Sequence, residues 1–248
     1  MNWRKIVKIL AGAFIVIGCL FAFLVWEGIC FITNPIESKY PVKGIDVSHY
    51  QGEIKWASIQ KDLGISFAFI KATEGSSHID EKFEENWEKA TGSGLNIGAY
   101  HFFSFDSDGK RQAKNFISHV PKKKNMLPPV VDVEYYGKKA NNPPKVKVVR
   151  KELDDLLFEL EKEYNCKPII YTTISVYQKY INEYYNSYPL WIRNVYYRPF
   201  LMKNRQWTFW QYSEKGNWPY GKTKTEKYVD MNVFAGSMDG FLRYFNLE

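Results

Sequence analysis

From residue 43 onward the chain contains eight short apolar runs rich in β-branched and aromatic residues, and the first five alternate with amphipathic helical stretches. The predicted strands are Lys43–Val47, Ser66–Lys71, Asn96–Phe103, Pro129–Glu134, Lys167–Thr172, Pro189–Arg193, Trp207–Tyr212 and Tyr228–Phe234. The predicted helices are Ile54–Leu63, Asp80–Thr91, Gly109–His119, Lys145–Tyr164 and Ser175–Tyr185. Strands that are apolar on both faces and joined by helices form a parallel sheet covered by helices. The pattern therefore predicts an α/β fold, a TIM-like barrel of five βα units followed by three β strands.

Such a barrel places its chemistry at the carboxyl ends of its strands, so the polar and aromatic residues there are the candidate site. They are Asp46, Glu74, Tyr100, His101, Asp132, Glu134, Tyr171, Trp191, Gln211 and Asp230. Sugar rings stack on aromatic faces, which makes Tyr50 and Trp210 further candidate subsites beside Tyr100, Tyr171 and Trp191. For each aromatic residue alone, packing in the core is the commoner role. Acids and aromatic side chains together favour a carbohydrate-binding cleft.

Asp132 and Glu134 end the predicted strand Pro129–Glu134 and are the sharpest candidates in this set. Alternate strand residues share a face, so both carboxylates point the same way, with backbone positions roughly 6.6 Å apart. In a partly desolvated site the first charge hinders ionisation of the second, so one of them is poised to hold a proton near neutral pH. Taken by itself, an Asp-x-Glu at a strand end can also simply meet solvent or neighbouring lysines.

Seven short motifs occur in order through the same region. They are Gly44–Gly52, Phe69–Gly75, Gly98–Phe102, Val131–Glu134, Leu190–Ile192, Trp210–Tyr212 and Val229–Asn232. Together they resemble glycoside hydrolase family 25, the Chalaropsis-type lysozymes. The resemblance implies an N-acetylmuramidase on a flattened barrel, an enzyme that cleaves the β-1,4 bond between N-acetylmuramic acid and N-acetylglucosamine in peptidoglycan.

Under this resemblance, Glu134 matches the family's general acid, Asp132 its partner carboxylate, and Asp46 and Asp230 the two flanking acids. Glycoside hydrolysis needs a proton for the leaving oxygen and negative charge near an oxocarbenium-like carbon, which two carboxylates of different protonation supply. The acetamide of an N-acetylated sugar can instead act as nucleophile while Asp132 orients it, and the sequence does not separate this route from inversion. Without the other motifs, Asp46 could cap a turn and Asp230 could belong to an ordinary loop.

The remaining polar candidates have supporting roles. Glu74 is expected to organise hydrogen bonds at the site. The histidines, at positions 49, 78, 101 and 119, lack zinc-ligand spacing, so we expect no metal and no cofactor, with His101 the one that lines the cleft. After Leu190–Ile192 the family usually has a small residue, whereas this chain has Arg193 followed by Asn194. Arg193 either turns into the cleft, where it would alter a subsite and can pair with a peptide or lactyl carboxylate, or turns outward to solvent.

An uncharged run of about 18 residues, from Ile9 to Trp26, is just long enough to cross a bilayer. Arg4, Lys5 and Lys8 precede it, and by the positive-inside rule these cations stay cytoplasmic. We expect residues 1–8 to be a cytoplasmic basic segment, 9–32 a transmembrane signal anchor, 33–41 a linker and 42–248 an extracytoplasmic catalytic domain. Two alternatives stay open: a cleaved signal peptide that releases a secreted protein, and a lipoprotein with Cys19 as its lipidated residue.

Charge and cysteine content narrow the remaining classes. The net charge is +7, but the cations are scattered among acids, only Lys122–Lys124 forms a run, and no motif supports nucleic-acid binding. Cys166 has no cysteine partner in the outer domain, which excludes a disulfide-stapled scaffold. We expect a membrane-tethered bacterial monomer that acts on the peptidoglycan glycan strand. The rival hypotheses are a non-catalytic peptidoglycan-binding or assembly protein on the same fold, and a chitinase-like glycosidase, for which no Asp-x-x-Asp-x-Asp-x-Glu run is present.

Overall fold

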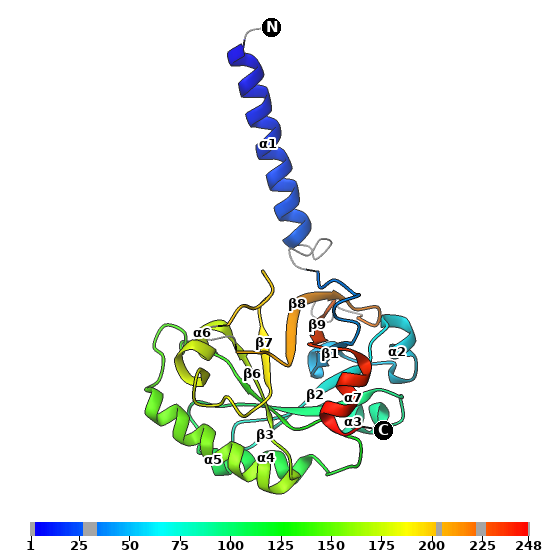
Figure 1. Ribbon diagram of the computed structural model, residues 1–248, viewed down its shortest axis with the longest axis vertical. Helices are drawn as coiled ribbons and strands as arrows, with labels where there is room; N and C mark the ends of the chain where they lie inside the picture. Colours follow the sequence, from blue (N-terminus) through cyan, green and yellow to red (C-terminus); the bar gives the residue numbers. More distant parts are fainter. Residues whose placement is uncertain (1–2, 27–33, 202–204, 222–226, 248) are drawn as a thin grey trace.

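The computed structural model describes residues 3–26, 34–201, 205–221 and 227–247, and its main body is a closed β-barrel surrounded by helices (Figure 1). The barrel strands are β1 (Lys43–Val47), β2 (Phe67–Glu74), β4 (Asn96–Phe102), β5 (Val130–Val133), β6 (Ile169–Thr173), β7 (Leu190–Arg193), β8 (Phe209–Asn217) and β9 (Tyr228–Phe234). They pair in the order β1-β9-β8-β7-β6-β5-β4-β2, and β2 pairs back to β1 to close the ring. The predicted eight-stranded barrel is confirmed.

Helices follow the first barrel strands and cover the outside of the ring (Figure 1). They are α2 (Trp56–Leu63), α3 (Phe83–Thr91), α4 (Gly109–His119) and α5 (Val146–Tyr164), with the short β3 (His78–Ile79) preceding α3. After β6 comes only the short α6 (Ile174–Val176), which continues into a π-helical turn, η2 (Tyr177–Ile181). The helix predicted to extend to Tyr185 ends earlier, because Asn182 leaves the helical conformation and Glu183 has a φ of +67°.

β9 runs antiparallel to both of its neighbours, β1 and β8, whereas the other pairs within the ring are parallel. The predicted parallel sheet therefore holds for the other strands of the ring, and β9 departs from it. Only a short connection separates the end of β8 at Asn217 from the start of β9 at Tyr228, and a short connection suits antiparallel neighbours. As a consequence, the beginning of β9 lies beside the carboxyl ends of the other strands.

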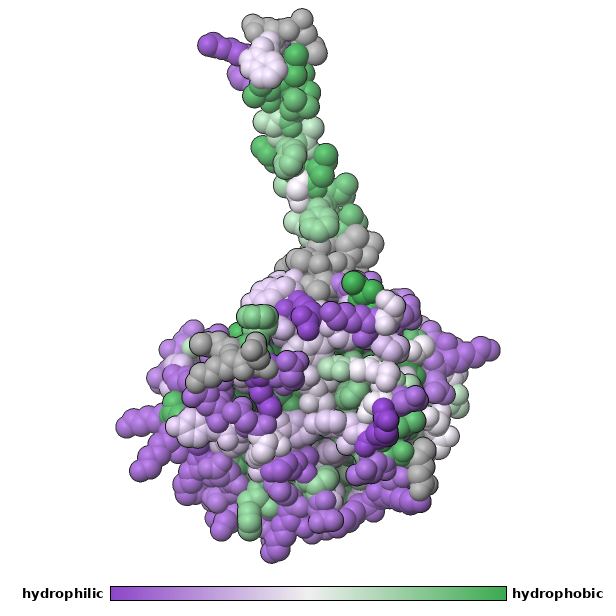
Figure 2. Space-filling model, in the orientation of Figure 1, coloured by the Kyte–Doolittle hydropathy of each residue, from purple (hydrophilic) through white to green (hydrophobic). Residues whose placement is uncertain are grey.

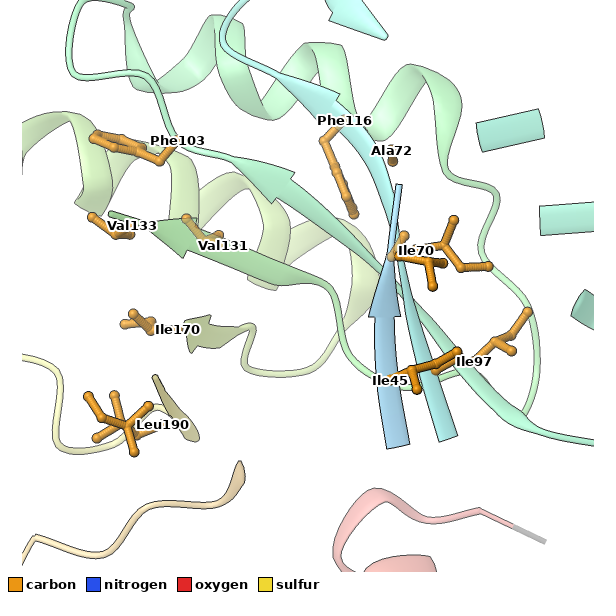
Figure 3. Close-up of a cluster of buried hydrophobic side chains, with 14 of the residues drawn as sticks. Ile45, Ile70, Ala72, Ile97, Phe103, Phe116, Val131, Val133, Ile170 and Leu190 are labelled. Atoms are coloured by element: carbon orange, nitrogen blue, oxygen red, sulfur yellow. The ribbon is translucent and has the colours of Figure 1, made fainter. Parts of the chain in front are cut away.

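Strand alternation divides the apolar side chains into two layers. Figure 3 shows part of the outer layer, in which Ile45, Ile70, Val131 and Val133 lie between the barrel and helix residues such as Phe116 of α4. The inner layer fills the barrel and includes Phe67, Phe69, Trp191 and Phe209. Helix α7 (Met238–Phe245) closes the end of the barrel at which the parallel strands begin. Its buried Phe241 stacks on Phe67, with 5.7 Å between the ring centroids. The opposite end of the interior is left to polar side chains.

A separate helix, α1 (Trp3–Trp26), precedes the barrel. Figure 2 shows it as mainly green, whereas the visible face of the barrel is mostly purple and white. By length and composition alone, residues Trp3–Leu24 suffice to cross a membrane, and none of that apolar window is buried. The helix begins before the predicted anchor, so Arg4, Lys5 and Lys8 belong to its first turns. The predicted end of the anchor at residue 32 and the start of the linker at 33 lie outside the described residues.

Candidate active site

A cleft opens at the end of the barrel where the parallel strands terminate. It is lined by Asp46, Val47, Ser48, Tyr50, Gln51, Lys71, Tyr100, Phe102, Val130, Asp132, Glu134, Tyr171, Trp191 and Asp230. The structure thus brings together all four predicted acids and four of the predicted aromatic residues. Tyr50 lies on a short 3-10 turn, η1 (His49–Gln51), and is 62% exposed, whereas Trp191 is buried in the floor. A cleft with a buried aromatic floor, an exposed ring at its rim and central acids has the composition of a saccharide site.

Asp132 and Glu134 reach the cleft because the residues that alternate with them, Val131 and Val133, pack outward against the helices. Burial is the main cause that raises the pKa of Asp132 well above its usual value, and the neighbouring charge of Glu134 adds to it. Burial also raises the pKa of Glu134, while Arg193 and Lys71 lower it. The Oδ1 atom of Asp132 is buried and has no hydrogen-bond partner among the described residues. The two carboxyl groups therefore hold protons readily, and the Oδ1 atom of Asp132 remains available to accept a hydrogen bond.

Asp46 and Asp230 face each other across the antiparallel β1–β9 pair. A hydrogen bond between their carboxyl groups lowers the pKa of Asp46 and raises that of Asp230. Burial is the largest cause in both cases and raises both pKa values, that of Asp230 well above its usual range. When two such carboxyl groups share one proton, the pair carries a single negative charge.

A buried amide pair holds that charge in place. Asn232 Nδ2 and Gln211 Nε2 donate to Asp46 Oδ2 at 2.7 and 2.9 Å. The amide oxygens are used as well, since Trp191 Nε1 donates to Asn232 Oδ1 and the Tyr171 hydroxyl donates to Gln211 Oε1, both at 2.9 Å. Asp46 is thereby connected to two aromatic residues of the cleft. The sequence analysis named Asn232 only as the end of a motif. Because Asn232 lies two residues after Asp230 on the same strand face, alternation could have predicted that it faces the site.

Two cations balance the acids. Lys71 was not among the predicted site residues, whereas the sequence placed Arg193 either in the cleft or outward in solvent. Lys71 lines the cleft and its Nζ atom lies 2.8 Å from Glu74 Oε2. Arg193 pairs with Glu214 of β8 and lowers the pKa of Glu134, Asp46 and Asp230. Lys71 follows Phe67 and Phe69 at strand spacing, so alternation alone predicts that it faces the interior.

The structure places four predicted substrate-binding residues away from the lining of the cleft. Glu74 pairs with Lys71 from outside it, and Gln211 lies beneath the cleft on Asp46. His101 differs from the expectation that it lines the cleft, because it lies on the opposite strand face from Tyr100 and Phe102, where it contacts Thr73 and Gln112. Burial lowers the pKa of His101 to about 4. Trp210 likewise faces outward and donates from Nε1 to the Asn194 carbonyl at 2.8 Å.

Among the residues that the structure describes, no group of three or more histidine, cysteine, aspartate or glutamate side chains has the geometry to hold a metal ion. The carboxyl groups of the cleft instead hydrogen-bond to each other and to amides, or lie near Lys71 and Arg193. What this arrangement can do chemically is donate a proton from a buried acid beside fixed negative charge, which is the requirement for glycoside hydrolysis.

Comparison with known proteins agrees with this chemistry. The family model of glycosyl hydrolases family 25 matches residues 45–220. YegX of Escherichia coli strain K12 is 37% identical over 213 residues, which cover 82% of this chain and 73% of that protein. Lysozyme M1 of Streptomyces globisporus is 33% identical over 212 residues, covering 79% and 68%. The structure of a family 25 glycosyl hydrolase from Bacillus anthracis superposes with a TM-score of 0.79 at 45% identity, covering 86% of this chain and 96% of that one.

Proposed function

This chain belongs to glycosyl hydrolases family 25, and from that premise we propose that it is a lysozyme-type peptidoglycan hydrolase acting in cell-wall turnover or remodelling. The proposed reaction is cleavage of the β-1,4 bond between N-acetylmuramic acid and N-acetylglucosamine. The observation that carries the proposal is the meeting of Asp46, Asp132, Glu134 and Asp230 in one aromatic-floored cleft. The relative named lysozyme M1 supports the choice of substrate.

Glu134 is the proposed general acid. It follows β5 directly, lines the cleft and is less deeply buried than Asp132, so it is the carboxyl group that a glycosidic oxygen can approach. Its raised pKa keeps a proton available, and Arg193 and Lys71 limit the shift so that the proton can also be released. A general acid works best when its pKa lies near the working pH, and these opposing influences move Glu134 in that direction.

Asp132 is the proposed partner that orients the substrate's acetamide. In the free site burial raises the pKa of both Asp132 and Glu134, so both carboxyl groups hold protons readily. When an acetamide N–H of the substrate donates to the unpartnered Oδ1 of Asp132, this hydrogen bond stabilises the carboxylate and lowers the pKa of Asp132. The charge that then forms on Asp132 raises the pKa of Glu134. The proton thus moves to the residue that must donate it.

The test of the function is incubation of the full-length protein, in mild detergent, with purified peptidoglycan. We expect soluble fragments whose new reducing ends are N-acetylmuramic acid, because that sugar precedes the proposed scissile bond. Borohydride reduction followed by mass spectrometry identifies the end. New N-acetylglucosamine ends would indicate a different glycosidase, and binding without any new reducing ends would indicate a non-catalytic glycan-binding protein. Either result would overturn the proposal.

Helix α1 is proposed to anchor the enzyme as a single-pass membrane segment with the barrel outside the bacterial cell. Support comes from its length of 24 residues, its exposed apolar side chains and the three cations in its first turns. A catalytic domain held in this way reaches only the cell wall of the cell that makes it.

Fractionation of cells that express the full chain tests the anchor. We expect the protein in the membrane pellet, resistant to alkaline carbonate and released by detergent, because an apolar helix is held by the bilayer core. A shortened form in the medium, beginning near Asn34, would contradict the anchor and indicate a cleaved signal. Cys19→Ser is the matched variant: it leaves a signal-anchor protein unchanged, whereas it would abolish lipid labelling of a lipoprotein.

A further inference from the structure

A second hollow adjoins the cleft on the far side of Arg193. We call it the side groove, and its polar lining consists of Thr173, Ser175, Gln178, Asn194, Tyr196 and Tyr197, together with Arg193 itself. The groove lies where β6 and β7 end, next to the cleft residues Tyr171 and Trp191 of the same two strands. Arg193 joins the two spaces, because it lines the side groove while its charge acts on Glu134.

Asn194 leaves an unused hydrogen-bond donor at this groove. Its backbone is held by Gln211 and Trp210, and its Oδ1 atom accepts from the Tyr196 backbone N–H at 3.2 Å. Asn194 is only 6% exposed, and the Nδ2 atom of its side chain is buried without a hydrogen-bond partner among the described residues. A buried donor without an acceptor is costly, and a ligand carbonyl or carboxylate oxygen would satisfy it.

The side chains of the groove suit a peptide that bears a carboxylate. Hydroxyl and amide groups supply neutral hydrogen bonds, the exposed rings of Tyr196 and Tyr197 supply apolar contact, and Arg193 is the charged side chain in the lining. Within the described part of the chain, no aspartate or glutamate lines the groove, and Glu214 reaches Arg193 from β8. The guanidinium geometry favours carboxylate ligands. In peptidoglycan, the group that combines amides with a carboxylate is the peptide carried by the lactyl ether of N-acetylmuramic acid.

We propose that Arg193 and the side groove bind the peptide stem of the muramic acid residue next to the scissile bond, with Arg193 exchanging Glu214 for a carboxylate of the stem. The inference rests on the proposed function and gives it a substrate class: glycan strands that still carry their peptides. The exchange is possible because the Arg193–Glu214 pair is partly exposed, with side-chain exposures of 30% and 46%. Such a pair is stabilised only weakly in water.

The test compares two substrates for the full-length protein in detergent. One is peptide-bearing glycan; the other is glycan whose peptides have been removed by an amidase and whose lactyl carboxylates have been converted to methylamides. We expect wild type to show the higher kcat/KM on the peptide-bearing strands, and Arg193→Ala to lower the ratio of the two values by about tenfold, as expected for loss of a charge-assisted hydrogen bond. The ratio cancels any effect on Glu134, because that effect reaches both substrates.

Two further variants separate binding from general damage. Gln178→Ala, which removes a groove amide without touching the acids, should lower the same ratio severalfold. Arg243→Ala on α7, at the opposite end of the barrel, should leave it unchanged. An unchanged ratio in Arg193→Ala, with both substrates cleaved, would overturn the peptide site while the proposed function stands. A third substrate is the glycan stripped of peptides whose lactyl carboxylates are left free. If Arg193→Ala lowers kcat/KM on this substrate as much as on peptide-bearing strands, Arg193 binds the lactyl carboxylate, and the peptide site is likewise overturned.

Binding provides a readout that does not depend on turnover. Calorimetric titration with N-acetylmuramyl dipeptide should show binding to wild type and about tenfold weaker binding to Arg193→Ala. If wild type cleaves neither glycan, the proposed function fails, and the titration alone decides the side groove: equal affinity of the two proteins, or no binding by wild type, rejects it.

Discussion

Replacing Glu134 with glutamine is expected to lower kcat on peptidoglycan by about a thousandfold, because the amide has nearly the same shape but cannot give up a proton. The side chain lines the cleft beside the other three acids. Because glutamine has nearly the same size as glutamate, the substitution removes the proton donor without opening a cavity. Release of reducing ends measures kcat, and binding of the variant to insoluble peptidoglycan shows that the cleft remains intact.

Glu163→Gln on the exposed face of α5 is the matched control, and it should keep the wild-type rate. Wild-type turnover should itself fall as pH rises through the pKa of Glu134, which burial raises above its usual value. A Glu134→Gln variant with kcat within a few-fold of wild type would remove Glu134 from the role of general acid.

Asp132→Asn is expected to stabilise the protein while abolishing most of its activity. The carboxyl group is buried beside Glu134 without a partner for Oδ1, so folding must either ionise it in a poor environment or protonate it. A neutral amide avoids that cost, and we expect a gain of about 1–3 kcal/mol in the free energy of unfolding at pH 7, the range typical of a buried polar group left without a partner. Activity should fall by about a hundredfold or more, because the amide oxygen of asparagine carries no negative charge and accepts only a weaker hydrogen bond from the acetamide N–H.

The pH dependence of this stability gain has a definite sign. The folded-state pKa of Asp132 lies above its unfolded value, so the folded protein binds the extra proton. Stability from this group is therefore complete below the unfolded pKa, and it is lost as pH rises toward the folded one. The advantage of Asp132→Asn should be large at pH 7 and shrink toward pH 4.

Chemical denaturation at a series of pH values measures this advantage. Asp239→Asn in the exposed first turn of α7 is the control, with an expected change of no more than about 0.5 kcal/mol at any pH. An Asp132→Asn variant that is less stable than wild type at neutral pH would show that the carboxyl group is not under strain.

Local patterns predicted most of the barrel because each strand and helix carries its own periodicity. The bounds of β1, β9 and α4 agree with the predicted runs at both ends. Strand alternation would also have placed Lys71 in the cleft, and would have moved His101 to the helix side, since both follow from the parity of residues already assigned. In β2 that parity fails after Lys71, because a bulge shifts the pairing between Lys71 and Thr73, and Thr73 therefore lies on the helix side, where it contacts His101.

Asp132 and Glu134 were recognisable in the sequence as a pair on one face of a strand, because the residues that decide this are adjacent in the chain. Only the tertiary structure decided how the other groups meet them. The reversal of β9 brings Asp230 against Asp46, and Asn232 reaches Asp46 across 186 positions of the chain. Arg193 is oriented by Glu214 on the next strand. These contacts depend on strand direction, register and closure of the ring, which arise from packing between distant segments and leave no periodic trace in the sequence.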